Sequence, residues 1–206
     1  SVIIVTWNSS DEIVNCVNSV IAALQGHESE LIIIDNNSSD DSFALVNRID
    51  FPQLNAIQNS ENLGYTKAIN QGIKLATGKY VLLLNPDTVL NDTSIKIMHD
   101  FMEANPDYGA CAPLMKNPDG SVQYSVRNFP TYWRMFCEFS LLAYIFPKTK
   151  LFGSWKAKYM DYSTEQDIGQ PMAAAFMIRS ELLAEIENMD ERFRMFFNDV
   201  DLCRKV

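Results

Sequence analysis

The sequence predicts an α/β fold in which a mostly parallel central sheet is flanked by helices. Strand patterns and helix patterns alternate through residues 1–110, as they do in right-handed βαβ units. The strand patterns are runs of consecutive apolar residues, which is typical of strands buried on both faces. The chain has 206 residues, of which 47% are hydrophobic, and this fits an ordinary globular domain.

The elements of residues 1–110 follow from the spacing of apolar residues. The predicted elements are strands at 2–6, 31–34, 56–57 and 81–84, and helices at 13–24, 43–49, 65–76 and 94–104. Ser9 or Ser10 is expected to cap the first helix, because a hydroxyl can accept a bond from a free backbone N–H. Gly78 is expected to end the third helix as a left-handed cap.

The second half of the chain is less regular. Val122, Tyr124 and Val126 alternate with polar residues, which predicts a half-exposed strand. A buried strand is predicted within 172–178, an aromatic-rich loop or strand at 193–197, and the start of a helix at 199–206. Since the chain lacks an initiating Met and stops in a helical pattern, we expect it to be part of a longer protein.

Residues Trp133 to Phe146 form a strongly apolar segment that Arg134 and Glu138 interrupt. The segment predicts a helix in the core or at a homodimer interface. The alternative is a peripheral contact with a membrane. At about fourteen residues it is too short to span a bilayer.

Composition makes several classes of function less favoured. The net charge is −9, which disfavours nonspecific binding to nucleic acid or anionic lipid, although a local basic or apolar patch remains compatible with it. The four cysteines are widely spaced, without metal-site or redox spacing, which predicts reduced thiols in a cytoplasmic protein. The sequence contains no signal peptide pattern and no run long enough to span a membrane.

The most informative motif is Asn85-Pro86-Asp87, which follows a buried strand. Asn-Pro-Asp also occurs at 105–107 and 117–119, but there it ends a helical pattern and enters an ordinary turn. Pro86 has no N–H to donate and stops the strand. Asp87 is therefore expected just beyond the carboxyl end of the strand, where ligands bind in open α/β sheets.

Polar residues also follow the other strands. Thr6 and Asn8 follow the first strand and Asp35 ends the second, so these groups are expected to meet Asp87 at one sheet edge. Such a cleft suits a nucleotide, and one carboxylate together with a diphosphate can hold Mg²⁺ or Mn²⁺. The chain has neither a GxGxxG motif after the first strand nor a P-loop, so a metal would have to neutralise the phosphates.

Five motifs in order carry a family resemblance, and together they span nearly the whole chain. They are Val2 to Ser9, Ile32 to Asp40, Asn62 to Tyr65 with Asn70-Gln71-Gly72, Leu83 to Asp87, and Asp190 to Phe193 followed by Asp199 to Cys203. The chain resembles an inverting glycosyltransferase of family 2 with the GT-A fold, in the subgroup that includes bacterial rhamnosyltransferases.

The resemblance implies a role for each of seven residues. It implies that Asp87 binds the divalent cation and that Asp199 is the catalytic base, with Asp201 as the nearest alternative. The residues implied to bind the nucleotide donor are Thr6 and Asn8 at the base, Asp35 at the nucleoside, and Asn62 and Gly64 nearby.

The chain departs from the family pattern on the acceptor side. Asn198 replaces the Glu that usually precedes the catalytic Asp, Glu187-Asn188 replaces a Gly-Gly pair, and Met172 to Ala175 replaces a Trp-x-x-Gly-Ala stretch. These departures keep open the alternative of a catalytically impaired sugar-nucleotide-binding protein. A nucleotidyltransferase is a further alternative, but it would require a basic, glycine-rich loop after the first strand.

The expected function is transfer of a sugar from dTDP-rhamnose or a UDP-sugar, with inversion, in bacterial surface polysaccharide synthesis. The acceptor would be a saccharide or a lipid-linked saccharide, and the protein would work in the cytoplasm or at the inner face of the plasma membrane. We expect a single domain, in which 1–110 binds the nucleotide sugar and 111–206 lies on the acceptor side and is truncated at its C-terminus.

Overall fold

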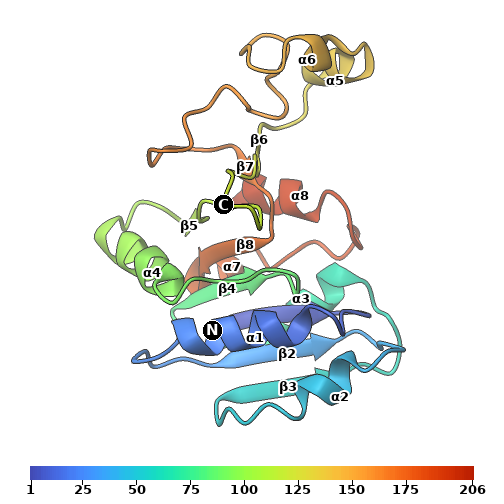
Figure 1. Ribbon diagram of the computed structural model, residues 1–206, viewed down its shortest axis with the longest axis vertical. Helices are drawn as coiled ribbons and strands as arrows, with labels where there is room; N and C mark the ends of the chain where they lie inside the picture. The colour runs from blue at the N-terminus through green and yellow to red at the C-terminus, as the bar shows by residue number, and fades with distance from the viewer. The chain divides into compact units, whose positions relative to one another are not determined.

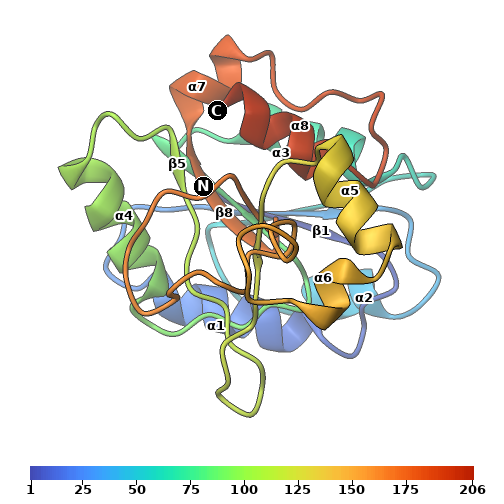
Figure 2. The same ribbon diagram turned by 90° about the horizontal axis from the view of Figure 1, so that it is seen from above.

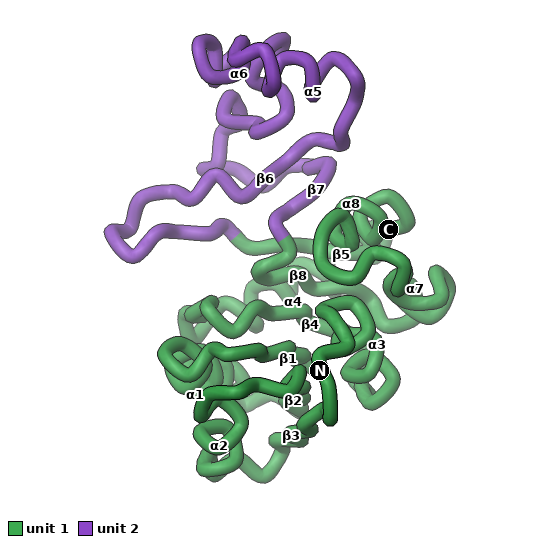
Figure 3. Tube along the Cα trace, turned by 90° about the vertical axis from the view of Figure 1, so that its right-hand side faces the viewer, with its two compact units in different colours: residues 1–113, 173–206 green, residues 114–172 purple.

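The computed structural model describes all 206 residues and divides the chain into two compact units (Figure 3). Unit 1 comprises residues 1–113 and 173–206, and unit 2 comprises residues 114–172. The predicted nucleotide-binding half, 1–110, lies entirely within unit 1. The predicted acceptor half, 111–206, is divided between the two units, because the chain returns to unit 1 after residue 172.

Unit 1 is built on a six-stranded sheet (Figure 1). The strands, in spatial order, are β3 (Leu54–Gln58), β2 (Leu31–Asp35), β1 (Val2–Thr6), β4 (Tyr80–Leu84), β8 (Ala175–Arg179) and β5 (Ala110–Cys111). The first four are parallel, whereas β8 is antiparallel to both of its neighbours. The predicted mostly parallel sheet is therefore confirmed, with an antiparallel strand that the sequence did not reveal.

Helices cover both faces of this sheet (Figure 2). The helices of unit 1 are α1 (Ile13–Ala23), α2 (Ser42–Val46), α3 (Tyr65–Leu75), α4 (Ser94–Ala104), α7 (Ser180–Glu185) and α8 (Asn198–Lys205). Helices α3, α7 and α8 lie on one face, and α1 and α4 lie on the other. Every residue of β1, β2 and β4 is buried, which explains why their sequences are apolar without alternation.

Two predicted helix caps are wrong. Helix α1 starts after Glu12, and no side chain caps it; the backbone oxygen of Ser9 accepts bonds from the N–H groups of Glu12 and Ile13 instead. Helix α3 ends at Leu75, and Gly78 does not adopt a left-handed conformation. Gly78 is needed for space, since a Cβ there would lie 2.6 Å from the nitrogen of Ser1.

Unit 2 has little regular structure. It contains the antiparallel strands β6 (Val126–Arg127) and β7 (Gln170–Pro171) and the helices α5 (Tyr132–Phe139) and α6 (Leu142–Ile145). Of the predicted strand at 122–126, only Val126 lies in a strand, while Val122 forms an isolated bridge with Lys116. No helix of the protein is both long enough and apolar enough to cross a bilayer.

The single helix predicted over 133–146 is wrong, because Leu141 breaks it with a φ of 64°. A core position for this segment is also wrong. Phe139 is 85% exposed and Tyr144 is 84% exposed, and the only buried residue of α5 is the small Cys137.

Two consecutive residues in unit 1 occupy the left-handed region, Glu187 (φ 59°) and Asn188 (φ 66°). This conformation explains why a Gly-Gly pair suits the position, because a Cβ there is strained by about 1–2 kcal/mol. Asn tolerates the left-handed region better than Glu does.

We expect Glu187→Gly to stabilise unit 1, since the relief of strain exceeds the entropy that Gly adds to the unfolded chain. The expected gain is about 1 kcal/mol, or a rise in Tm of about 2–4 °C for a protein of this size. Thermal unfolding followed by circular dichroism measures it, with Asn188→Gly as the matched variant and a smaller expected gain. A fall in Tm for Glu187→Gly would contradict the strain argument.

Candidate active site

Thr6 and Asp35 lie side by side at the carboxyl ends of β1 and β2, where they are partners in the strand register. Both residues are fully buried. Asp35 Oδ2 accepts bonds from the Ser38 backbone N–H (3.0 Å) and from Gln58 Nε2 (3.1 Å). The other carboxylate oxygen, Oδ1, and the Thr6 hydroxyl have no hydrogen-bond partner in the protein. A buried polar atom without a partner is rare and destabilising, so this pair suggests a place for ligand N–H and O–H groups.

The loops that follow β1 and β2 are joined through Asn8, which has a φ of 52°. Its backbone N–H donates to Ser38 Oγ (2.9 Å), and its Oδ1 accepts from the Ser39 N–H (2.8 Å). Nearby, the Ser10 N–H donates to Asp40 (3.0 Å). Asn8 therefore holds together the two loops that surround Thr6 and Asp35.

An asparagine network connects β2 to the loop before α3; Asn36 is buried in it and Asn62 is exposed. Asn36 donates from Nδ2 to Asn62 Oδ1 (2.9 Å), and its Oδ1 accepts from the Leu63 N–H (3.0 Å) and Asn59 Nδ2 (3.2 Å). Asn62 Oδ1 also accepts from the Gly64 N–H (2.9 Å). The sequence interpretation assigned no role to Asn36, although its position directly after a buried strand was an available signal.

Gly64 precedes α3 with a φ of 84°, a conformation that favours glycine. A Cβ at this position would lie 3.1 Å from the backbone oxygen of Arg194. The same oxygen accepts from the Thr66 N–H (3.3 Å), and the Thr66 hydroxyl donates to the backbone oxygen of Phe193. The aromatic loop at 193–197 is thus attached to the start of α3.

Asp199 is the second residue of α8, and its neighbour Asn198 attaches that helix to α3. Asn198 is buried; its Nδ2 donates to Thr66 Oγ1 (3.2 Å) and its Oδ1 accepts from the Asp199 N–H (2.8 Å). The hydroxyl of Tyr65 is buried without a partner, and burial followed by the negative charge of Asp199 raises the pKa of Tyr65. Since α3 begins at the carboxyl edge of the sheet, Asp199 lies at that edge too.

Asp87 is exposed in the turn beyond β4, as predicted. The turn is fixed to the residue before β8, because Ala174 O accepts from the Asn85 N–H (2.9 Å) and from Thr88 Oγ1 (3.3 Å). Cys16 Sγ on α1 donates to the Asn85 oxygen (3.5 Å). Burial, and then the charge of Asp87, raises the pKa of the Cys16 thiol to about 12.

The structure contains no group of three or more His, Cys, Asp or Glu residues that could hold a metal ion. Asp87 contributes a single exposed carboxylate. That donor set fits Mg²⁺ or Mn²⁺ whose other ligands come from a diphosphate and water.

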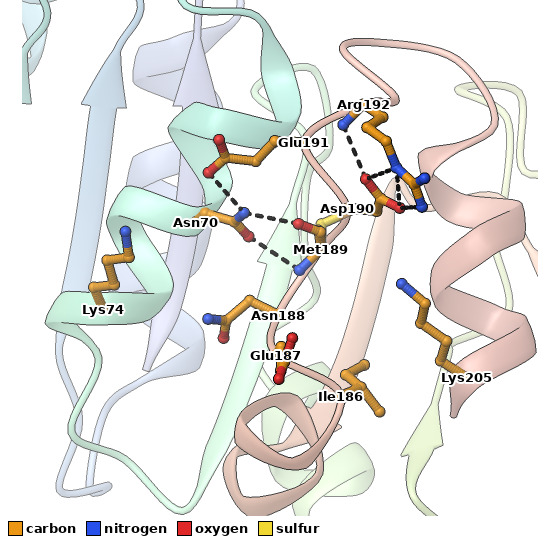
Figure 4. A pocket seen from close by; sticks show the side chains of 10 residues that line it. All are labelled: Asn70, Lys74, Ile186, Glu187, Asn188, Met189, Asp190, Glu191, Arg192 and Lys205. Atoms are coloured by element: carbon orange, nitrogen blue, oxygen red, sulfur yellow. Dashed lines mark hydrogen bonds and ion pairs between the residues drawn. The ribbon is translucent and has the colours of Figure 1, made fainter.

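A polar cavity of about 530 Å³ lies away from these residues, between α3, the 186–192 loop and α8 (Figure 4). None of the seven predicted site residues lines it. Asn70 fixes the loop by donating to the Met189 oxygen (2.8 Å) and accepting from its N–H (3.1 Å). Hydrogen bonds from Arg192 lower the pKa of Asp190 to about 2. These contacts give the Asp190–Arg192 motif a role in holding the loop before α8.

These elements define an α/β fold with polar side chains gathered at the carboxyl edge of its sheet, and comparison with known proteins identifies the family. The profile of the family described as Glycosyl transferase family 2 matches residues 1–168. This chain belongs to glycosyl transferase family 2, and the predicted resemblance is confirmed.

Solved structures confirm the GT-A fold. Staphylococcus aureus TarS in complex with UDP-GlcNAc matches with a TM-score of 0.66 and 19% identity over 99% of this chain. The mannosyltransferase PcManGT from Pyrobaculum calidifontis, in complex with GDP-Man and Mn²⁺, matches with a TM-score of 0.63 and 17% identity over 92% of this chain. The chain spans about half of these two structures, 52% and 47% respectively.

Two relatives with known names are a rhamnosyltransferase and a polysaccharide synthase. An N-acetylglucosaminyl-diphospho-decaprenol L-rhamnosyltransferase of Mycobacterium tuberculosis is 27% identical over 98% of this chain and 68% of its own length. A poly-beta-1,6-N-acetyl-D-glucosamine synthase of Staphylococcus epidermidis is 32% identical over 57% of this chain and 29% of its own length.

Proposed function

We propose that this glycosyltransferase transfers a sugar with inversion from dTDP-rhamnose or a UDP-sugar to a saccharide or lipid-linked acceptor. The product would belong to a bacterial surface polysaccharide, made at the cytoplasmic side of the membrane. Family membership supports sugar transfer, and the name of the mycobacterial relative supports both the rhamnosyl donor and the lipid-linked acceptor.

One observation carries the donor assignment. Asp35 Oδ1 and Thr6 Oγ1 are buried acceptors without partners on adjacent strands. A pyrimidine nucleoside offers a ring N–H and sugar hydroxyls, so its binding would satisfy both atoms in a low-dielectric site. Asn8 and Asn62 hold the surrounding loops, and Gly64 allows a close backbone approach there.

Asp87 would hold the divalent cation together with the donor diphosphate. When bound, the cation supplies positive charge that stabilises the departing diphosphate. The bonds from Asn85 and Thr88 to Ala174 fix the turn that carries Asp87, so its carboxylate is positioned before the donor arrives.

Asp199 would deprotonate the acceptor hydroxyl as it attacks the sugar. Inversion requires one direct displacement, so the protein needs a general base and no covalent intermediate. Asn198 holds the Asp199 backbone and is bonded to α3, so it positions the base without carrying charge.

A catalytically impaired sugar-nucleotide-binding protein would bind the donor in the same way and transfer nothing, so the transfer assay described in the Discussion separates the two functions. Membership of glycosyl transferase family 2 argues against a nucleotidyltransferase.

Calorimetric titration of UDP and dTDP, with Mn²⁺ and with EDTA, tests the donor and cation sites. We expect Mn²⁺ to strengthen binding to the wild-type protein, and Asp87→Ala to lose about tenfold or more of the affinity measured with Mn²⁺. In EDTA the two proteins should bind alike. Asp92→Ala removes another exposed carboxylate, just before α4, and should retain the Mn²⁺ effect. An unchanged Mn²⁺ effect in Asp87→Ala would refute the cation role.

A further inference from the structure

Unit 2 exposes nine large apolar side chains on α5, α6 and the adjoining chain. We call this surface the aromatic face. Its exposed residues are Tyr132, Trp133, Phe136, Phe139, Leu141, Tyr144, Ile145, Phe146 and Leu151. Three of its rings are connected by contacts: Trp133 stacks on Phe136 (5.7 Å between centroids), and both Trp133 and Phe146 pack on Phe152. A concentration of exposed apolar side chains of this kind marks an interaction site.

A surface helix usually turns its polar side chains to solvent and its apolar side chains inward, and α5 does the opposite. Its polar Arg134 points into unit 2, where it donates to Ser154 Oγ (3.1 Å) and to the backbone oxygen of Phe129. Glu138 is half-buried and accepts from Lys156 (2.8 Å). Tyr132 is meanwhile 99% exposed. The polar side chains of α5 make their contacts within unit 2, and its aromatic side chains face outward. The aromatic side chains are therefore available to bind a partner outside unit 2.

The segment that carries the aromatic face is basic, although the protein as a whole is acidic. The chain has a net charge of −9, yet residues 129–160 carry five basic side chains and one acidic side chain, Glu138. Arg134 is bonded within unit 2 and Lys156 pairs with Glu138, so the remaining basic side chains are Lys148, Lys150 and Lys158. Lys148 and Lys150 are exposed directly beside Phe146 and Leu151. A surface that is apolar and locally basic complements one that is apolar and negatively charged.

We propose that the aromatic face binds the surface of an anionic lipid bilayer. The Trp, Tyr and Phe rings would enter the headgroup level, and the lysines would contact lipid phosphates and carboxylates. Binding would be peripheral, because α5 has eight residues and no helix could cross the bilayer. The proposal does not depend on the sugar-transfer function.

A second copy of this chain is a poorer partner for the same face. In a symmetric dimer the same surface meets itself, so the Lys148 and Lys150 side chains of one copy would lie near those of the other. Like charges brought together at an interface oppose association. An anionic bilayer turns the same lysines into attractive contacts.

Vesicle sedimentation without any sugar nucleotide tests the proposal on the whole chain. Vesicles of phosphatidylcholine alone are compared with vesicles that also contain phosphatidylserine. We expect binding to the phosphatidylserine vesicles, and about a tenfold or greater loss in the triple variant Tyr132→Ser, Phe139→Ser, Tyr144→Ser. The matched control, Val89→Ser with Ile97→Ser, removes exposed apolar side chains of unit 1 and should bind as the wild type does.

Charge is tested separately with Lys148→Glu combined with Lys150→Glu, which should lose about tenfold or more of the binding and abolish its salt sensitivity. The matched control, Lys67→Glu with Lys74→Glu on α3, should have no effect. Circular dichroism and sedimentation velocity accompany each variant. The proposal would be overturned if the protein bound both kinds of vesicle equally or bound neither. It would also be overturned if the protein were a dimer that the triple serine variant dissociates.

Discussion

Replacing Asp199 by Asn is expected to reduce the rate of sugar transfer about 100-fold or more and to leave donor affinity nearly unchanged. The amide has the size of the carboxylate but cannot accept a proton, and a general base contributes about 10²- to 10⁴-fold to the rate. Donor binding is assigned to Thr6, Asp35 and Asp87 on other elements, so it should not depend on α8. Transfer of a radiolabelled sugar and calorimetry of the nucleotide measure the two effects separately.

Asp201→Asn is the matched control for the base. Asp201 lies two residues further along α8 and forms an ion pair with Lys205 (2.7 Å), so its carboxylate already has a partner. We expect this variant to keep most of the activity. Full activity in Asp199→Asn, with a large loss in Asp201→Asn, would transfer the role of base to Asp201. If the wild-type protein binds the donor but transfers sugar to none of the acceptors tested, the result would support a catalytically impaired sugar-nucleotide-binding protein instead.

Asp35→Asn is expected to weaken the binding of UMP or dTMP about 10- to 100-fold, in EDTA as well as with Mn²⁺. The carboxylate oxygen that lacks a partner is assigned to a nucleoside N–H or hydroxyl, and a hydrogen bond to a charged group contributes about 1.5–3 kcal/mol. A monophosphate lacks the diphosphate that a cation requires, so it reports on the nucleoside contact alone.

The control for Asp35 is Asp41→Asn, which removes a charge from an exposed residue whose side chain does not cap α2. It should bind UMP as the wild type does. Because Asp35 also accepts bonds from Ser38 and Gln58, the Tm of Asp35→Asn is measured to verify folding. An effect of Asp35→Asn that requires Mn²⁺ would show that Asp35 serves the cation and not the nucleoside.

The elements that the sequence predicted best are those whose environment is uniform. Strands β1, β2 and β4 are buried on both faces, so all their positions before the polar ends Thr6 and Asp35 are apolar, and the run is visible without knowledge of the fold. The helix at 94–104 was predicted to the residue, since its apolar stripe begins directly after a turn. The position of Asp87 followed from the same buried strand.

Other features depend on contacts that the sequence does not reveal. An apolar run reads the same in both directions, so the antiparallel orientation of β8 could not be predicted. Nothing in the apolar pattern of 133–146 signals the positive φ of Leu141 that divides the segment into two helices. The bond from Asn198 to Thr66 joins residues that are distant in the chain, so a departure from the family pattern proved to be a structural contact.

The place of β8 between β4 and β5 has a consequence for synthesis on the ribosome (Figure 1). Strand β5 has no partner in the sheet other than β8, and β8 emerges only after the whole of unit 2 has been translated. At typical translation rates that interval lasts about 3 to 12 seconds. During it the apolar edge of β4 is unpaired, and such an edge can recruit strands from other nascent chains. The growing chain therefore exposes an unpaired apolar strand edge until residues 175–179 leave the exit tunnel, and it is most prone to aggregate during that interval.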